Sequence, residues 1–206
     1  MERWLALELA STIRHDGDGG VTDDLATAHG ATRWIHAQAD LLTGRVPAGE
    51  MAADDDLRVE VIELRRAVRA LFARAVSPAA PSSADARQLM PADQALAHLN
   101  TVAARETVVP QMDWLPDAGG PTTRLLSAES DPKIRLVAAL ARAAIDFLSG
   151  PQYTQLRACS APRCVRYFVK SHGRQEWCKP SCGNRARAAR HYRRQREAGD
   201  DGSAPS

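Results

Sequence analysis

Apolar residues recur every three or four positions along much of the first 150 residues, the spacing that places them on one face of an α-helix. The pattern is most regular over residues 56–76, where the apolar stripe consists of Leu57, Val61, Leu64, Val68, Leu71 and Ala75. Other helices are expected over residues 3–14, with Leu5, Leu9 and Ile13 on one face, and from Pro91 through Ala103. Asp131-Pro132 supplies an N-cap and a first-turn proline for a further helix that runs to Leu148 and ends at Gly150-Pro151.

Glycines and capping residues divide the segment between these helices. Residues 16–20 are rich in glycine and predict a loop. Thr22 is followed by two aspartates, which suit the positive end of a helix dipole, so it is the expected start of a second helix. We expect Gly30 to interrupt this helix before a piece that carries Trp34 and Leu42, and Gly44 to end it.

One part of this region predicts strands. Residues 107–109 and 112–115 precede Gly119-Gly120, and residues 122–126 follow it, which together predict a small β-hairpin. The prolines and small residues of positions 77–83 predict a connector. The fold class is therefore mainly α, with a helical domain over residues 1–150 that carries one small hairpin.

An arginine row accompanies the apolar stripe of the helix over residues 56–76: Arg58, Arg65, Arg66, Arg69 and Arg74. Such a row could form an anion site or a second nucleic-acid surface. We favour a solvated face whose arginines pair with Glu60, Glu63 and the acids of neighbouring helices. Trp34 and Trp114 are expected in the core.

The formal net charge of +2 conceals a division of the chain. Residues 1–156 carry 15 basic and 21 acidic side chains, whereas residues 157–197 carry 12 basic and 2 acidic ones. An acidic body joined to a basic segment suggests two separate tasks. No apolar run approaches the roughly 20 residues of a membrane span.

All four cysteines lie in the basic segment, at Cys159, Cys164, Cys178 and Cys182. Two close pairs, C-x4-C and C-x3-C, separated by 13 residues are typical of a structural zinc site. Four thiolates leave no position for a catalytic water. Two disulfides are the alternative, but they need an oxidising compartment, and the acidic N-terminus does not resemble a signal peptide. We therefore expect a reducing, cytoplasmic location.

The residues between the cysteines suit a treble-clef-like finger. Residues 167–169 predict a short strand, and residues 175–177 are expected to return as a second strand into Cys178. Pro180 then opens a helix with Cys182 in its first turn. This finger is expected over residues 151–198, followed by a disordered tail at residues 199–206.

The literal sequence Cys182-Gly183-Asn184-Arg185, preceded by Trp177-Cys178 and followed by a basic helix, resembles the CGNR zinc finger. In that family the finger follows a helical ABATE domain, and the start of this chain, residues 7–12, is similar to the opening of that domain. The resemblance implies a stress-induced transcription regulator whose helical domain has a sensory or regulatory role. Lys170 stands where the family commonly has an acidic residue, and residues 175–176 stand where basic residues are usual.

The basic helix carries six arginines between Arg185 and Arg196 and no acid before Glu197. Helical geometry groups five polar residues on one face, which we expect to contact nucleic acid: Asn184, Arg187, Arg190, His191 and Arg194. The opposite face, with Cys182, Ala186, Ala189 and Tyr192, is expected to point toward the zinc. Gly183 and Arg185 are expected to support the zinc site by close packing and by hydrogen bonding to sulfur, and Trp177 to cover it.

These features favour a DNA-binding transcription regulator in which the helical domain senses a signal or forms a homodimer. An RNA-binding or ribosome-associated zinc protein is one alternative, since the same arginines would bind structured RNA. A module that binds an acidic protein partner is another. An enzyme is not expected, because the six histidines are scattered and the chain has no phosphate-binding glycine loop, no G-x-S-x-G and no H-E-x-x-H motif.

Overall fold

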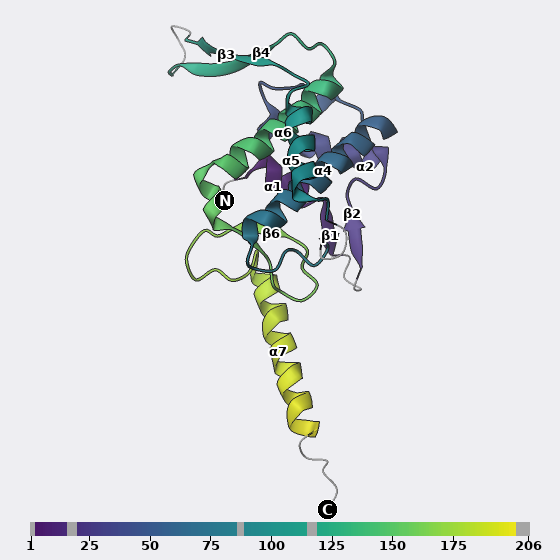
Figure 1. Cartoon of the computed structure of the whole chain (residues 1–206), viewed down its shortest axis with the longest axis vertical. Helices are drawn as coiled ribbons and strands as arrows, with labels where there is room; N and C mark the ends of the chain where they lie inside the picture. The colour runs from purple at the N-terminus through teal and green to yellow at the C-terminus, as the bar shows by residue number, and fades with distance from the viewer. Residues whose placement is uncertain (1–2, 16–19, 86–88, 115–118, 201–206) are drawn as a thin grey trace, which may run out of the picture.

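The computed structural model describes residues 3–15, 20–85, 89–114 and 119–200, with side chains described up to Gln195. A helical body occupies the middle of the molecule, a β-hairpin projects from one end, and the C-terminal helix projects from the other (Figure 1). The helices are α1 (Leu5–Ala10), α2 (Ala28–Ala37), α3 (Ala39–Leu42), α4 (Asp55–Val76), α5 (Ala92–Ala103), α6 (Pro132–Ser149) and α7 (Pro180–Asp200), with short 3-10 helices η1 (Ala48–Glu50) and η2 (Pro151–Gln155). The strands form three antiparallel pairs: β1 (Ile13–His15) with β2 (Val21–Asp23), β3 (Val108–Asp113) with β4 (Thr122–Ser127), and β5 (Leu156–Ala158) with β6 (Tyr167–Val169).

Helix α4 lies at the centre of the body and packs against α1, α5, α6 and β5. Its apolar stripe is buried as the periodicity predicts, and Asp54 caps its first turn by accepting a hydrogen bond from the backbone N–H of Leu57. Asp131 caps α6 in the same way. Phe72 on α4 and Phe147 on α6 pack with their ring centroids 5.3 Å apart. The predicted mainly α class is confirmed, and among the described helices none is long and apolar enough to cross a membrane.

The prediction of one helix over residues 3–14 is wrong. Helix α1 ends at Ala10, and Ile13 begins a strand that pairs with Asp23. The chain turns because two arginines of α4 reach it: Arg69 donates to the carbonyl of Ala10 at 2.6 Å, and Arg65 donates to the hydroxyl of Thr12 at 3.0 Å. Residues 16–19 of the predicted loop lie outside the described residues.

The second helix also starts later than predicted. Positions 22 and 23 belong to β2, and α2 begins at Ala28 with Thr27 as its N-cap. Gly30 lies inside this helix and does not interrupt it. Its role is steric, because a Cβ atom at this position would lie 2.4 Å from the backbone oxygen of Asp24. A glycine therefore allows α2 to approach the turn after β2. Gly44 lies past the end of α3 with a φ of 74°.

The arginine row of α4 is not one solvated face. Arg66 pairs with Glu63 near the surface, as predicted, but Arg65 and Arg69 are only 4% and 2% exposed. Arg65 forms two hydrogen bonds to the carboxylate of Asp23, at 2.5 and 2.8 Å. Burial opposes the charged form of Asp23, but these bonds outweigh it and lower the pKa of this carboxyl. The pair thus attaches the β1–β2 hairpin to α4.

The predicted hairpin over residues 107–126 is present as β3 and β4. It extends away from the helices as an arm, seen at the top of Figure 1. Trp114, next to β3, was expected in the core but is 69% exposed, whereas Trp34 is buried as expected. Leu115 and residues 117–118 lie outside the described residues.

The C-terminal segment packs onto the body through its own sheet. Leu156 of β5 and Tyr167 of β6 belong to the main hydrophobic core, whereas Phe168 points to a second, smaller core that contains the cysteines. Alternate residues of a strand face opposite sides, so β6 joins the two cores. Helix α7 continues to Asp200, which makes the first two residues of the predicted tail helical. Residues 201–206 lie outside the described part of the chain.

Candidate metal centre and basic helix

Four cysteine sulfurs meet in the small core, from Cys159, Cys164, Cys178 and Cys182. The four sulfur atoms all lie within 4.8 Å of one another. The sulfur of Cys178 lies 3.7 Å from that of Cys164 and 3.5 Å from that of Cys182. Disulfide sulfurs would be about 2.05 Å apart, and all four cysteines are free. A tetrahedral zinc ion with Zn–S bonds of about 2.3 Å requires sulfurs roughly 3.8 Å apart, so the arrangement fits structural zinc.

The environment of the sulfurs distributes their protons unequally. Hydrogen bonds with Cys159 and Cys178, and one from the backbone of Arg166, lower the pKa of Cys164 to about 3. Hydrogen bonds to Cys159 and Cys164 raise the pKa of Cys178, and burial and the negative charge of these neighbouring sulfurs raise it further. A bound zinc ion favours the thiolate at all four positions. The cluster is therefore a site where a cation relieves the repulsion between neighbouring sulfurs.

Backbone and side-chain donors complete the surroundings of the thiolates. Arg185 donates from Nη2 to the sulfur of Cys182 at 3.2 Å, as the sequence predicts. The backbone N–H of Cys178 lies 3.5 Å from the sulfur of Cys159. The backbone carbonyl of Arg166 accepts a hydrogen bond from the N–H of Cys159 at 2.9 Å. Such second contacts orient ligands and reduce the negative charge on sulfur.

The strand expected over residues 175–177 is absent from the described structure, in which β6 pairs with β5 instead. The side chain of Gln175 makes the local contacts: its oxygen accepts from the backbone N–H of Ser171, and its amide donates to the carbonyl of Trp177. The loop into Cys178 is therefore held by a side chain and not by a strand ladder. Helix α7 begins at Pro180 and carries Cys182 in its first turn, as predicted.

Trp177 packs against the metal cluster and is half-buried. A Cβ atom on Gly183 would lie 3.0 Å from Cε3 of this indole, so the glycine permits the close contact. The guanidinium of Arg190 lies over the same ring, 5.7 Å from its centroid. Trp177 and Gly183 therefore pack against each other beside the cysteine cluster.

Helix α7 carries the residues predicted to contact nucleic acid, and all five of them are exposed: Asn184, Arg187, Arg190, His191 and Arg194. The Oδ1 of Asn184 accepts a hydrogen bond from Arg187 at 2.6 Å. Tyr192 was expected to face the zinc but is 67% exposed, because the helix has left the small core by that turn. Arg193, which the predicted face did not include, is exposed as well.

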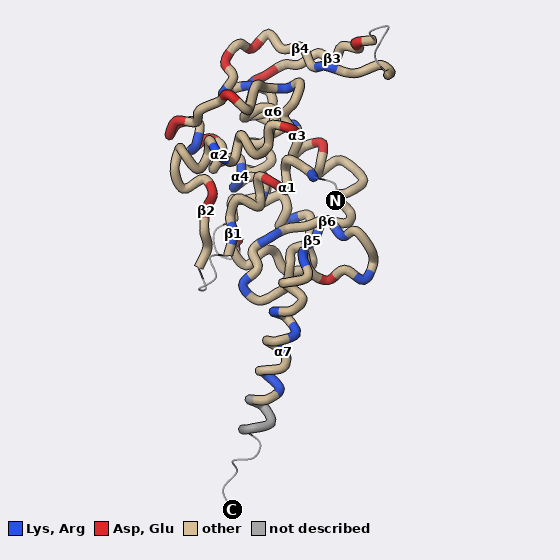
Figure 2. Tube along the Cα trace, turned by 180° about the vertical axis from the view of Figure 1, so that it is seen from behind, with Lys and Arg blue, Asp and Glu red and all other residues tan. Residues whose placement is uncertain are grey.

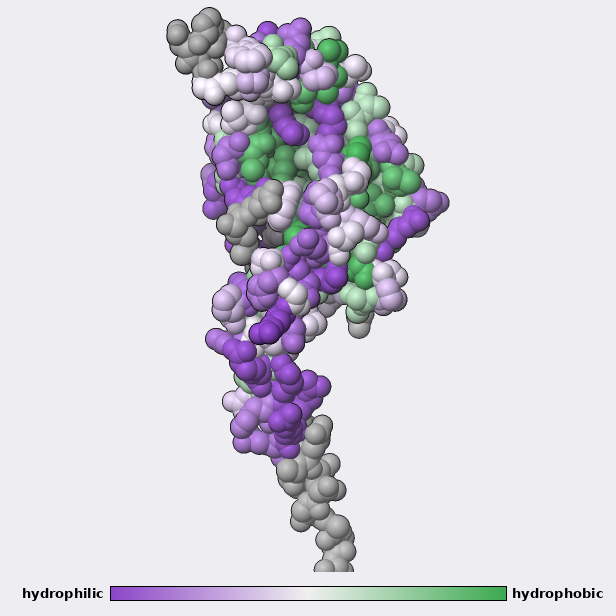
Figure 3. Space-filling view, turned by 90° about the vertical axis from the view of Figure 1, so that its left-hand side faces the viewer, coloured by the Kyte–Doolittle hydropathy of each residue, from purple (hydrophilic) through white to green (hydrophobic). Residues whose placement is uncertain are grey.

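Up to Gln195, the charged side chains of this helix are all basic. Figure 2 shows Lys and Arg, and no Asp or Glu, along the coloured part of α7. In the space-filling view the same segment presents a hydrophilic surface as it leaves the body (Figure 3). The described side chains of α7 beyond its second turn thus form a basic, solvent-exposed rod.

The comparison with known families agrees with both parts of this description. Residues 4–151 match the ABATE family, described as "Putative stress-induced transcription regulator". The chain belongs to the ABATE family. Residues 155–195 match the CGNR zinc finger, so the four cysteines are the ligands of a structural zinc. No curated protein matches the chain.

A buried polar network that the sequence did not predict connects the ABATE region to the finger. Arg69 of α4 binds the carboxylate of Asp85 through two nitrogens, at 2.8 and 3.0 Å, and donates to the carbonyl of Val165 at 3.2 Å. Tyr167 donates at 2.7 Å to Oδ2 of Asp85, which also accepts from Arg69, and the hydroxyl of Ser82 donates to the carbonyl of Val165 at 2.9 Å. Burial, followed by the charge of Asp85, raises the pKa of Tyr167, which keeps this donor protonated.

The network extends to the metal ligands. Ser83 donates to the backbone carbonyl of Cys164 at 3.3 Å. The connector after α4 therefore clamps the first cysteine loop through Ser82, Ser83 and Asp85, and α4 holds the connector through Arg69. The only sequence signal was the position of Arg69 at the border of the apolar stripe of α4, because its partners lie 16 and 96 residues away.

Proposed function

We propose that this ABATE protein is a DNA-binding transcription regulator that presents α7 to DNA from a zinc-stabilised finger. The supporting observation is that α7 stands clear of the body (Figure 1) and that its arginines at positions 187, 190, 193 and 194 are exposed. An α-helix with side chains is about 10–12 Å across, which matches the roughly 12 Å width of the B-DNA major groove. The family description as a regulator of transcription supports the same function.

The structure suggests different tasks for the two halves of the helix face. Near the zinc, Arg187 and Arg190 are held by Asn184 and by the ring of Trp177. Preorganised guanidiniums suit base edges, because less side-chain entropy is lost on binding. The other two residues of the face, His191 and Arg194, are also exposed, and His191 contacts the neighbouring ring of Tyr192; both suit phosphate contacts. We assign base recognition to the first pair and backbone contacts to the second.

Charge separation supports this orientation. The finger segment, residues 157–197, has a formal net charge of +10, which becomes about +8 with one zinc and four thiolates, whereas residues 1–156 carry −6. The acidic ABATE region is repelled by phosphate while the finger is attracted. The protein therefore approaches DNA with α7 first.

Dimerisation, sensing and location belong to the same proposal. Nine residues from Arg187 to Gln195 span about 13 Å, or roughly four base pairs, so one finger has too few contacts for a unique site. We propose that the region over residues 1–150 forms a homodimer or responds to a signal, while the region over residues 151–198 binds DNA. A non-enzymatic, cytoplasmic protein is consistent with this function and with free cysteines.

Selection of sequences from a random DNA library by the full-length, zinc-loaded protein tests the proposal. The binding-face variant is Arg187→Gln with Arg190→Gln, and the matched control is Arg174→Gln, which removes an exposed arginine from the finger loop. We expect an enriched motif that is lost in the binding-face variant and in Cys178→Ser and retained in the control. Salt-sensitive binding without a motif, or a motif unchanged by the binding-face variant, would contradict specific recognition by α7.

RNA is the second candidate, and one observation favours it. Tyr192 is 67% exposed beside His191, with the two ring centroids 6.1 Å apart, which offers an aromatic surface for an unpaired base. Tyr192→Ala should reduce RNA binding strongly under this alternative and leave duplex DNA binding almost unchanged under the first. Competition between a duplex DNA and a structured RNA, measured with both variants, separates the two.

A further inference from the structure

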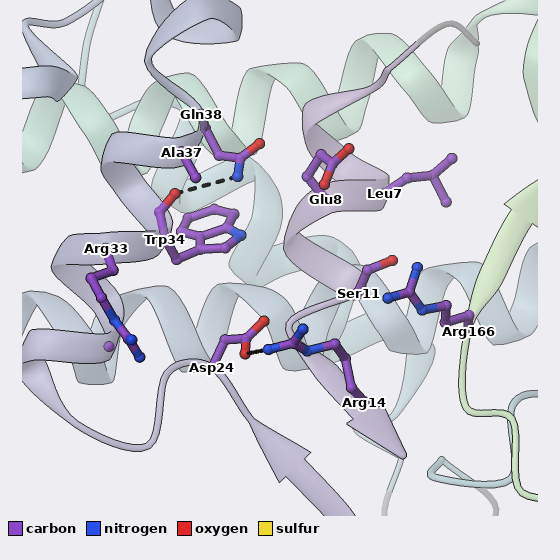
Figure 4. Close-up of a pocket in the computed structure, with 11 residues that line it drawn as sticks. Leu7, Glu8, Ser11, Arg14, Asp24, Arg33, Trp34, Ala37, Gln38 and Arg166 are labelled. Carbon is purple, nitrogen blue, oxygen red and sulfur yellow. Dashed lines mark hydrogen bonds and ion pairs between the residues drawn. The ribbon is translucent and has the colours of Figure 1, made fainter. Parts of the chain in front are cut away.

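A cavity of about 460 Å³ is lined by residues of the ABATE region and by Arg166 of the finger, and none of the lining residues belongs to α7. Its walls come from α1, β1, α2 and the segment just before β6, as the close-up shows (Figure 4). The volume is in the range of pockets that hold small ligands. No role follows for this cavity from the zinc site or from the basic helix.

The charges around the cavity do not balance. Arg14 forms an ion pair with Asp24, and Glu8 pairs at 3.1 Å with Arg3, which lies outside the lining and also pairs with Asp40. Two further guanidiniums line the cavity, those of Arg33 and Arg166. Across the described part of the chain, neither side chain has a hydrogen bond or an ion pair. The three arginines and two carboxylates of the lining therefore give the cavity a formal net charge of +1.

These two arginines approach from different parts of the protein. Arg33 projects from α2 on one side of the cavity, and Arg166 enters from the finger on the other side, with its guanidinium directed toward Ser11 (Figure 4). A guanidinium offers a planar set of donors that matches a carboxylate or a phosphate. Both guanidiniums and the hydroxyl of Ser11 belong to the lining, so a bound anion has cationic and hydroxyl groups available from both parts of the protein.

The rest of the lining is suited to the apolar part of a small molecule. The buried indole of Trp34 and the side chains of Leu7 and Ala37 form part of the wall. Gln38 is fixed beside them, because its amide donates to the carbonyl of Trp34 and its oxygen accepts from Arg3. A flat apolar surface next to unpaired guanidiniums favours an acid with a ring or a short carbon chain over an inorganic ion.

The position of Arg166 connects the cavity to the metal centre. While its side chain lines the cavity, its carbonyl accepts from the N–H of Cys159 at 2.9 Å, and it follows Cys164 by two residues along the chain. A ligand that holds this side chain against α2 therefore also restrains the segment that positions two of the zinc ligands. Ligand binding and retention of the metal are coupled, and by linkage each stabilises the other.

We propose that this cavity is the effector site of the protein and binds a small organic anion, a carboxylate or a phosphate monoester, between Arg33 and Arg166. The anion fastens the finger to the ABATE region and so changes how firmly the base of α7 is held. This inference is independent of whether α7 binds DNA or RNA, because the site and its test involve neither.

Calorimetric titration of the full-length, zinc-loaded protein with benzoate, phenyl phosphate and neutral benzamide tests the site. We expect saturable binding of one anion per chain, with the tighter of the two acids identifying a carboxylate or a phosphate ligand, and no binding of benzamide. Arg33→Gln and Arg166→Gln should each weaken binding by roughly tenfold or more, because each removes one charge-assisted contact. Arg174→Gln, on the same finger but outside the cavity, should bind like the unmodified protein.

A second measurement follows the transfer of zinc to a chromophoric chelator. Saturation with the better anion should slow the transfer in the unmodified protein and in Arg174→Gln, but not in Arg166→Gln. The proposal is overturned if neither acid binds saturably with a dissociation constant below ~10 mM, or if binding is unchanged in both cavity variants. Binding that leaves zinc transfer unchanged would refute the bridge between the ABATE region and the finger.

Discussion

Replacing Tyr167 by Phe removes one oxygen atom from the network that joins the ABATE region to the finger. The ring and its packing are retained, including the contact with Phe72 at a centroid distance of 5.5 Å. Two hydrogen bonds are lost: the phenol donates to Asp85 at 2.7 Å and accepts from the backbone N–H of Ser82 at 3.2 Å. Asp85 keeps its two bonds from Arg69, but the buried N–H of Ser82 is left without its partner.

The size of the effect follows from these two losses. A hydrogen bond to a charged acceptor contributes about 1.5–3 kcal/mol, and an unsatisfied buried donor costs about 1–3 kcal/mol. Some relaxation is expected, so the free energy of unfolding should fall by about 2–3 kcal/mol. With a urea dependence of ~2 kcal/mol/M, the midpoint of unfolding should fall by about 1–1.5 M.

Urea unfolding followed by circular dichroism measures this change. The matched control is Tyr153→Phe, since that tyrosine is exposed and its hydroxyl makes no hydrogen bond in the described structure. The control should change stability by less than about 0.5 kcal/mol. Release of zinc to a chelator should shift together with the helical signal, because the network clamps the first cysteine loop. If Tyr167→Phe behaves like its control, or if zinc release and helix unfolding shift independently, the described coupling is refuted.

Three further predictions concern a close contact, a buried acid and a ligand contact. Gly30→Ala should lower the melting temperature because its methyl group would meet the backbone oxygen of Asp24, whereas Gly49→Ala, which meets nothing within 4 Å, should have little effect. Burial opposes the charge of Glu106, but two arginines of α6 outweigh it and lower the pKa of this carboxyl. The contribution of Glu106 to stability is therefore complete above the unfolded pKa of about 4.3 and is lost as pH falls through the lower folded pKa. In Glu106→Gln the free energy of unfolding, measured by denaturant at a series of pH values, should depend less on pH across this acidic range. The same pH dependence in the variant and the unmodified protein would contradict the assignment. Arg185→Gln removes a hydrogen bond to a thiolate and should weaken zinc binding about 10–100-fold in chelator competition, with an unchanged affinity as the contrary result.

The parts of the fold that could be predicted depend on residues close together in the chain. The period of α4, the Asp131-Pro132 start of α6 and the two cysteine pairs are local patterns, and the structure has all of them. The packing of Arg185 on a thiolate and of Gly183 under Trp177 followed from their distance to a ligand along α7.

The errors arise where distant residues decide the structure. Ile13 has the right spacing for a helix, but Arg65 and Arg69 from the middle of α4 bind the turn before it. Those arginines looked solvated because their acidic partners, Asp23 and Asp85, lie on separate segments. The sequence did contain a sign that Arg65 is buried, because this residue directly follows Leu64 and lies four residues after Val61, at the edge of the buried stripe.

In the finger, too, contacts between residues distant in the sequence decide a feature that local patterns did not predict. Its strand β6 was predicted correctly, but the partner strand lies before Cys159 and not after Gly173. Short strands carry little information about which segment they pair with, because pairing is set by the core that each side of the strand fills. Here Tyr167 packs in the main hydrophobic core and Phe168 packs in the small core with the cysteines, so the sheet forms where the two cores meet.

The strand β6 also limits how this protein can be recombined with others. A chimera that joins residues 151–198 to a foreign partner would expose Leu156 and Tyr167, which here are buried in the ABATE core. The same cut would leave Arg69 and Asp85 facing water in the donor protein. Zinc fingers are often treated as interchangeable parts, but this one shares side chains with its neighbour. New specificities are therefore better engineered by substitutions on the exposed face of α7 than by exchange of whole fingers.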